Sequence, residues 1–195
     1  MSKVRPPLVV VDAHDCSSWS VIQPDLATPN AAEAFRLLGR DLPIVQRLPE
    51  LEKSQHMLLA RTGATAVLVT LDRDGTALLT AEGVTHTTHA HPVAEKSAAG
   101  AGDTFIAALT LALSAGLGIP AAAEFAQAAA DVVVRRFGTS VCSTQELVEY
   151  LNEQGSTVLA EDALIRRLME DRAAGRTIVF TNGCLTYCIA ATPAI

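Results

Sequence analysis

A small-residue turn that leads directly into an apolar helix constrains this chain more than any other part of its sequence. The run from Ala98 to Phe105 reads AAGAGDTF and is followed by the apolar stretch Ile106 to Leu113. Its two glycines let the backbone turn tightly, so that successive N–H groups converge on an anion at the positive end of the helix. The turn therefore predicts an anion-binding site at the start of a helix.

Asp103, beside this turn, has two interpretations. A phosphate repels a neighbouring carboxylate, so a carboxylate at this place indicates a chemical function, such as taking a proton from a hydroxyl that attacks the phosphate. Aspartate is also a common helix cap, and glycine-rich turns before helices are frequent. The turn by itself leaves both interpretations open.

Strand-like and helix-like segments alternate along the chain, which predicts a layered α/β domain with a mainly parallel sheet. Gly39 is expected to close the first helix in a left-handed conformation. The expected strands cover residues 8–11, 66–70, 76–80 and 84–89, with a turn at 72–75, and the expected helices cover 30–38, 44–62, 103–116, 120–134 and 144–150.

A polar stretch near residue 155 is the expected domain boundary. We assign residues 1–151 to a first domain, 152–158 to a linker and 159–195 to the start of a second domain. Within the last range, Ala160, Leu164 and Leu168 recur every four residues, as in an amphipathic helix, and a strand is expected around Ile178.

Composition excludes several classes of function. The net charge is −6 and no basic cluster is present, which argues against a nucleic-acid partner. No apolar run approaches the ~20 residues that a membrane helix needs. The N-terminal residues do not resemble a signal peptide. We therefore expect a cytoplasmic protein without a membrane partner.

Cysteine and histidine residues form no convincing metal site in the sequence. Cys16 and Cys142 are far apart and are interpreted as reduced thiols. The pair of cysteines near the C-terminus, at 184 and 188, lacks a second pair to complete a site. His89 and His91 would share one face of a strand, but no acid or cysteine lies nearby in the sequence, so they are interpreted as exposed strand residues.

Four segments carry a resemblance to the ribokinase-like sugar kinases, also called the phosphofructokinase-B family. The run GAGDTF with its helix resembles the second signature of that family. The other three agree in order: Asn30–Glu33 is similar to its N-x-x-E motif, Leu68–Gly75 to the strand and turn of the nucleotide site, and Phe125–Ser140 to the helix beside the adenine. The resemblance implies the C-terminal part of a ribokinase-like domain, without the half that binds the sugar.

The resemblance also implies a reaction, the in-line transfer of the γ-phosphoryl group of ATP to a sugar hydroxyl. The roles fall on nine residues: Asp103 is the base; the N–H groups of Gly100, Ala101 and Gly102 form the anion hole; Asn30, Thr70, Gly75 and Gln127 bind ATP; and Glu33 places Mg²⁺ through water. Asn30 and Glu33 also fit a helix capping box, and Thr70 and Gly75 also fit an ordinary strand end and turn.

The stretch Thr177–Cys184 resembles the first strand of a Rossmann-like nucleotidyltransferase domain found in the bifunctional heptose branch of the family. That likeness implies phosphorylation of D-glycero-D-manno-heptose 7-phosphate to the 1,7-bisphosphate in ADP-heptose biosynthesis, by an enzyme that is a homodimer when complete and inactive as this fragment. The H-x-G-H loop of that domain is missing, and one added base after the codon of Leu185 would restore it. The alternatives are another sugar or nucleoside kinase and a non-catalytic nucleotide-binding remnant.

Overall fold

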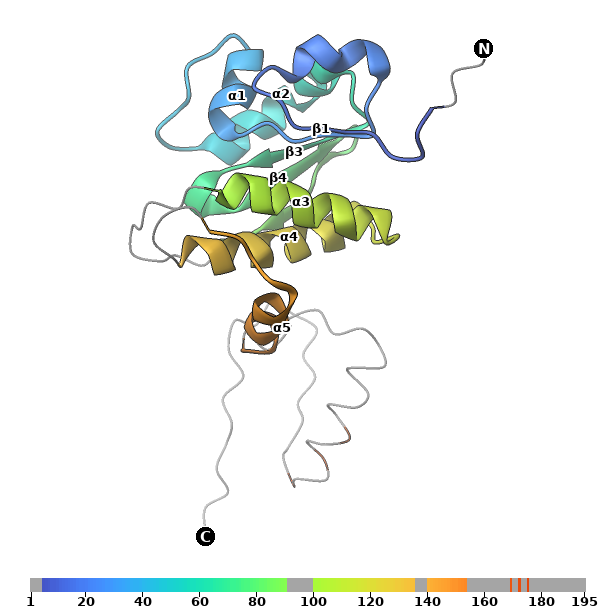
Figure 1. Ribbon diagram of the computed structural model, residues 1–195. Helices are drawn as coiled ribbons and strands as arrows, with labels where there is room; N and C mark the ends of the chain where they lie inside the picture. Colours follow the sequence, from blue (N-terminus) through green and yellow to red (C-terminus); the bar gives the residue numbers. More distant parts are fainter. Residues whose placement is uncertain are drawn as a thin grey trace. The chain divides into compact units, whose positions relative to one another are not determined.

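A five-stranded mixed sheet forms the centre of the first 150 residues (Figure 1). Its first two neighbouring strand pairs are parallel and its last two are antiparallel. The order along the sheet is β1 (Val10–Val11), β2 (Leu26–Ala27), β3 (Ala66–Thr70), β4 (Thr76–Thr80) and β5 (Gly83–Thr88).

The computed structural model describes residues 5–90, 100–135 and 140–153, together with Met169, Arg172 and Gly175. The chain divides into two units, Met1–Tyr150 and Leu151–Ile195. The helix and strand expected around Leu164 and Ile178, and the tail after Leu185, lie outside the described residues.

Helices cover both faces of the sheet (Figure 1). On one face lie α1 (Ala31–Leu37) and α2 (Arg47–Thr62), and on the other α3 (Ala101–Ser114) packs against α4 (Ile119–Val134). Two short 3₁₀ helices, η1 (Cys16–Ile22) and η2 (Asp72–Asp74), and a final helix, α5 (Thr144–Glu153), complete the described elements. The predicted layered α/β architecture is confirmed.

β3 is buried on both faces because helices cover both sides of the sheet. Val67 and Val69 pack in a cluster with Phe35 of α1 and Leu58 of α2, and all four are at most 1% exposed. Leu68 points to the opposite face, since side chains alternate along a strand, and it is also fully buried. Burying such a side chain contributes about 1.5–3 kcal/mol, so β3 holds the two helical layers to one sheet.

Most expected elements are found close to their predicted bounds, and Gly39 has the expected left-handed conformation with φ +67°. α2 begins at Arg47 rather than near residue 44, because Gln46 has a left-handed backbone with φ +62°, which cannot continue a right-handed helix. α3 begins two residues before Asp103. α5 continues through Glu153, into the first two residues of the expected linker.

Two elements were not predicted, η1 and β2. β2 has only two residues, too few for a period in the sequence to show, and three residues that include Pro24 separate it from η1. β5 ends at Thr88, so His89 lies beyond the strand on which it was expected, and His91 lies outside the described residues. Among the described helices, none has the length and apolar character that crossing a bilayer requires.

Candidate active site

A cavity of about 390 Å³ lies where the segment after β1, the start of α1, the end of β3 and the start of α3 meet. Five of the nine predicted site residues line it, although they come from three distant parts of the chain. The lining residues are Asp12, Ala13, His14, Thr28, Asn30, Glu33, Thr70, Gly102, Asp103, Phe105 and Ile106.

Asn30 and Glu33 form a complete capping box at the start of α1. The Asn30 side chain accepts a hydrogen bond from the Glu33 backbone N–H at 2.9 Å, and Glu33 Oε2 accepts one from the Asn30 backbone N–H at 2.9 Å. Asn30 also forms an isolated parallel bridge with Thr70 at the end of β3. The capping interpretation is confirmed, and the same bonds place Asn30, Glu33 and Thr70 together at the cavity.

Gly100 begins α3 in a left-handed conformation, with φ +96°, and is its N-cap. Gly102 lines the cavity, and a Cβ added there would meet nothing within 4 Å. The backbone at the start of α3 is therefore open to a ligand at the positive end of the helix. Gly100 and Ala101 are not among the residues that line the cavity.

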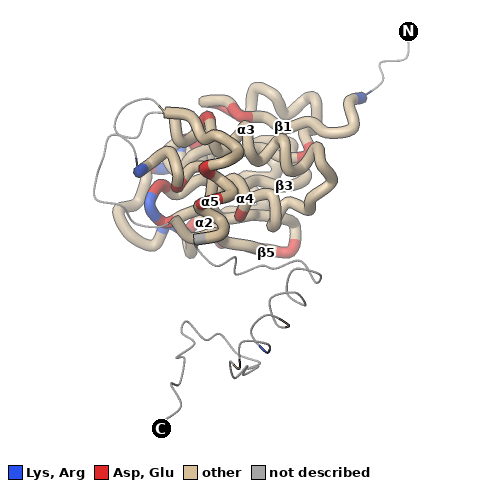
Figure 2. The backbone as a smooth tube through the Cα atoms, turned by 60° about the horizontal axis from the view of Figure 1, so that its bottom comes forward, with Lys and Arg blue, Asp and Glu red and all other residues tan. Residues whose placement is uncertain are grey.

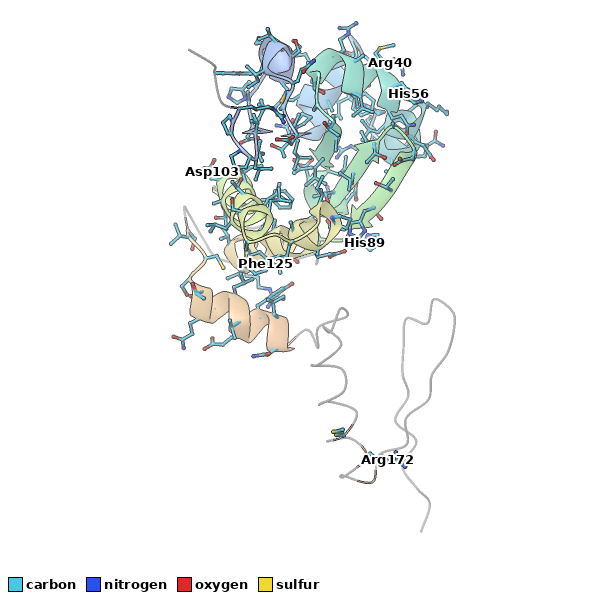
Figure 3. All side chains as sticks on the ribbon, turned by 90° about the vertical axis from the view of Figure 1, so that its right-hand side faces the viewer. Arg40, His56, His89, Asp103, Phe125 and Arg172 are labelled. Atoms are coloured by element: carbon cyan, nitrogen blue, oxygen red, sulfur yellow. The ribbon has the colours of Figure 1, made fainter. Side chains whose placement is uncertain are left out.

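Asp103, labelled in Figure 3, lies in the first turn of α3 and is the only charged residue of that helix. Figure 2 marks acidic residues in red and basic residues in blue along the backbone. Asp103 does not cap the helix, because Gly100 takes that position. No described residue forms a hydrogen bond or ion pair with its carboxylate, which is exposed and lines the cavity. The carboxylate is thus free to accept a proton from a bound molecule.

Asp12, just after β1, is a third acid at this cavity and was not among the site residues predicted from the sequence. Loss of hydration raises the pKa of Asp12 above its usual value of 3.8, and the negative charges of Glu33 and Asp103 raise it further. A hydrogen bond from the Thr28 hydroxyl at 3.1 Å opposes the rise. The cavity therefore holds an excess of negative charge.

This donor set fits a Mg²⁺ ion that arrives with a ligand. Carboxylate and amide oxygens are ligands that Mg²⁺ prefers, and the excess negative charge favours a cation. Among the described residues, however, no group of three or more His, Cys, Asp or Glu side chains is placed to hold a metal directly. Mg²⁺ usually keeps several waters and is held by one or two carboxylates together with ligand phosphates.

Gln127 lies away from the cavity lining, in a buried hydrogen-bond chain. Its Oε1 accepts from the Thr88 hydroxyl at 3.1 Å, and its Nε2 donates to Asp131 at 2.8 Å. Asp131 also accepts from the Tyr150 hydroxyl at 2.9 Å. The chain of bonds links β5, α4 and α5, and its predicted contact with ATP stays a prediction.

Gly75 likewise lies outside the cavity lining, at the end of η2. Its backbone has φ +84°, and a Cβ there would lie 2.1 Å from the carbonyl oxygen of Thr88. Only glycine fits this close approach of the turn to β5. The turn interpretation is sufficient to explain Gly75, and its contact with ATP stays a prediction.

Comparison with known sequences identifies relatives along most of the chain. The pfkB family of carbohydrate kinases matches residues 11–146. The bifunctional protein HldE of Shewanella baltica (strain OS185) is 34% identical over 190 residues, covering 94% of this chain and 39% of that protein. The HldE protein of Shewanella sp. (strain ANA-3) is 38% identical over 190 residues. The chain spans about two fifths of the length of these curated relatives, with 39% covered in each.

Solved structures share the fold. Phosphofructokinase-2 from Escherichia coli, in complex with substrates and products, has a TM-score of 0.61 and 23% identity over 75% of this chain and 47% of its own. Ribokinase from Thermotoga maritima has a TM-score of 0.59 and 25% identity over 74% of this chain and 49% of its own. With the family matched from residue 11 to residue 146, the chain belongs to the pfkB family of carbohydrate kinases.

Proposed function

We propose that the protein containing this chain transfers the γ-phosphoryl group of ATP to a hydroxyl of a sugar phosphate. The observation that carries the proposal is that Asn30, Glu33, Thr70, Gly102 and Asp103 line one and the same cavity. ATP use is also supported by a structural neighbour, Arabidopsis thaliana ribokinase complexed with ribose and ATP, at 26% identity and a TM-score of 0.57.

Asp103 acts as the base in this proposal. The sugar hydroxyl gives its proton to the Asp103 carboxylate while its oxygen forms a bond to the γ-phosphorus, and the bond between that phosphorus and the β–γ bridging oxygen breaks to release ADP. Support comes from the place of Asp103, exposed at the cavity with no described partner for its carboxylate.

The N–H groups of Gly100, Ala101 and Gly102 stabilise the transferred phosphoryl oxygens. The first N–H groups of a helix lack partners within the helix and carry its positive partial charge. The open space at Gly102 supports close approach of an anion to this backbone. Because these donors are fixed before the reaction, they need little reorganisation as charge develops.

The nucleotide site is proposed to be lined by Thr70, Gly75, Asn30 and Gln127. Bound Mg²⁺ would neutralise charge on the phosphates. Glu33 would hold it through water, and the capping box keeps the Glu33 carboxylate at the start of α1 beside Asn30.

For the acceptor we propose D-glycero-D-manno-heptose 7-phosphate, converted to its 1,7-bisphosphate. The proposal rests on the similarity to bifunctional HldE proteins and on the Thr177–Cys184 stretch. We also propose that the chain consists of a kinase domain in residues 1–151, a linker in 152–158 and the start of a nucleotidyltransferase domain in 159–195.

The test uses the full-length protein that contains this chain, with heptose 7-phosphate, fructose 6-phosphate and ribose as acceptors. Asp103→Asn should lower kcat at least about 10²-fold, as loss of a general base does, while the affinity for ATP is kept. Asp41→Asn, at an exposed loop position, is the matched control. Full activity of Asp103→Asn would refute the role of the base, and a preference for fructose 6-phosphate or ribose would refute the proposed acceptor.

A further inference from the structure

The two carboxylate oxygens of Glu33 have different partners. Oε2 accepts from the backbone N–H of Asn30 at 2.9 Å and closes the capping box. Oε1 lies 2.8 Å from Nδ1 of His14. The Glu33 side chain is 11% exposed, so these two contacts determine how a nearly buried carboxylate faces the cavity.

A hydrogen bond, and not packing against neighbouring side chains, positions the His14 side chain. Its side chain is 98% exposed, and its bond to Glu33 is the one hydrogen bond that the described residues give it. His14 is also the one basic side chain among the described residues that line the cavity, where the acidic side chains are Asp12, Glu33 and Asp103. An exposed imidazole would otherwise rotate freely, so the contact with Glu33 selects one orientation.

We propose that His14 is a positioning residue for Glu33, and this inference rests on the proposed function. A carboxylate oxygen has two lone pairs, so Oε1 can accept from His14 and still accept from a metal-bound water. His14 and the backbone of Asn30 hold the carboxylate from two sides, and its remaining lone pairs keep a fixed direction toward the cavity. Such outer partners commonly change metal affinity or activity by 10–100-fold, and the exposure of His14 favours about tenfold.

The test compares His14→Ala with His14→Asn in the full-length protein. The amide nitrogen of asparagine occupies nearly the place of Nδ1 and can donate to Glu33, whereas alanine cannot. His56→Ala is the matched control, because His56 is an exposed histidine on α2, away from Asp103 (Figure 3). The readout is Mn²⁺ binding in the presence of a non-hydrolysable ATP analogue, measured by electron paramagnetic resonance, together with the melting temperature.

We expect His14→Ala to weaken Mn²⁺ binding about tenfold, with an unchanged melting temperature and unchanged metal-free nucleotide affinity. His14→Asn should restore most of the loss, and His56→Ala should behave as wild type. Unchanged Mn²⁺ affinity in His14→Ala, or no rescue by asparagine, would overturn the inference. Failure of the proposed function is a separate result, in which Asp103→Asn keeps its kinase activity whatever the Mn²⁺ titration gives.

Discussion

Replacing Gly75 by alanine should be among the most damaging small substitutions in the chain. Gly75 follows η2 with φ +84° and ψ −132°, a conformation that side-chain-bearing residues rarely adopt. A Cβ would lie 2.1 Å from the carbonyl oxygen of Thr88 and 2.6 Å from its carbonyl carbon, and both are backbone atoms. The end of β5 would therefore have to move away from the turn between β3 and β4.

The size of the effect follows from three terms. A side chain in such a conformation costs about 1–3 kcal/mol, and forcing an extra methyl group into a packed site costs about 1–3 kcal/mol. The reduced freedom of the unfolded chain returns about 0.4–1 kcal/mol. We expect Gly75→Ala to lose about 3 kcal/mol of unfolding free energy, a large part of the stability of an ordinary domain.

Gly116→Ala is the matched control. Gly116 also has a positive φ, +92°, but a Cβ there would meet nothing within 4 Å. It should therefore show only the conformational cost, about 1–2 kcal/mol. Urea unfolding of both variants and the wild type measures the difference in unfolding free energy, provided that the three proteins share the same m-value, the slope of that free energy against urea concentration. If Gly75→Ala were as stable as Gly116→Ala, the steric reasoning would be wrong, and if it also lost ATP affinity, the nucleotide role of Gly75 would be favoured instead.

Three further substitutions test the buried hydrogen bonds and the acidic cavity, each by urea unfolding. Thr88→Val leaves Gln127 Oε1 without its hydroxyl donor and should cost about 1–3 kcal/mol; a neutral result would contradict the buried chain. Tyr150→Phe removes a donor to buried Asp131 and should cost a similar amount, about 1–3 kcal/mol. Because the pKa of Asp12 is raised on folding, its ionisation weakens the fold as pH rises above 3.8, so Asp12→Asn should stabilise the protein at neutral pH and lose that advantage in acid.

The sequence predicted those strands and helices whose pattern is local. β3 and β4 were found at their expected bounds, 66–70 and 76–80, because an apolar run on each side of a Gly-containing turn is sufficient to show a pair of strands. β2 was missed because two residues carry no pattern, and its place in the sheet comes from pairing with β1 and β3. Pairing between distant segments is a property of the fold and not of any local stretch.

The same difference between local and distant information explains which residues of the cavity could be predicted from the sequence. Gly102 and Asp103 were identified from one short run, and Asn30 with Glu33 from another, since each motif lies within a few residues. Asp12 was missed because it belongs to no short motif. The available signal was its position at the carboxyl end of a buried strand, where parallel sheets commonly bind ligands.

The sequence left two interpretations, helix capping and a place at the ligand site, both for Asn30 with Glu33 and for Asp103, and the structure resolves the two cases differently. For Asn30 and Glu33, helix capping and a place at the cavity are compatible, because the bonds that cap α1 also hold both residues beside Thr70. For Asp103, capping and a free carboxylate exclude each other, and the cap position belongs to Gly100. A residue that caps a helix gains a precise position from its bonds, whereas the Asp103 carboxylate has no described hydrogen-bond partner and gains only the modest attraction of the helix N-terminus. This asymmetry makes Asp103 the residue whose substitution best separates function from folding.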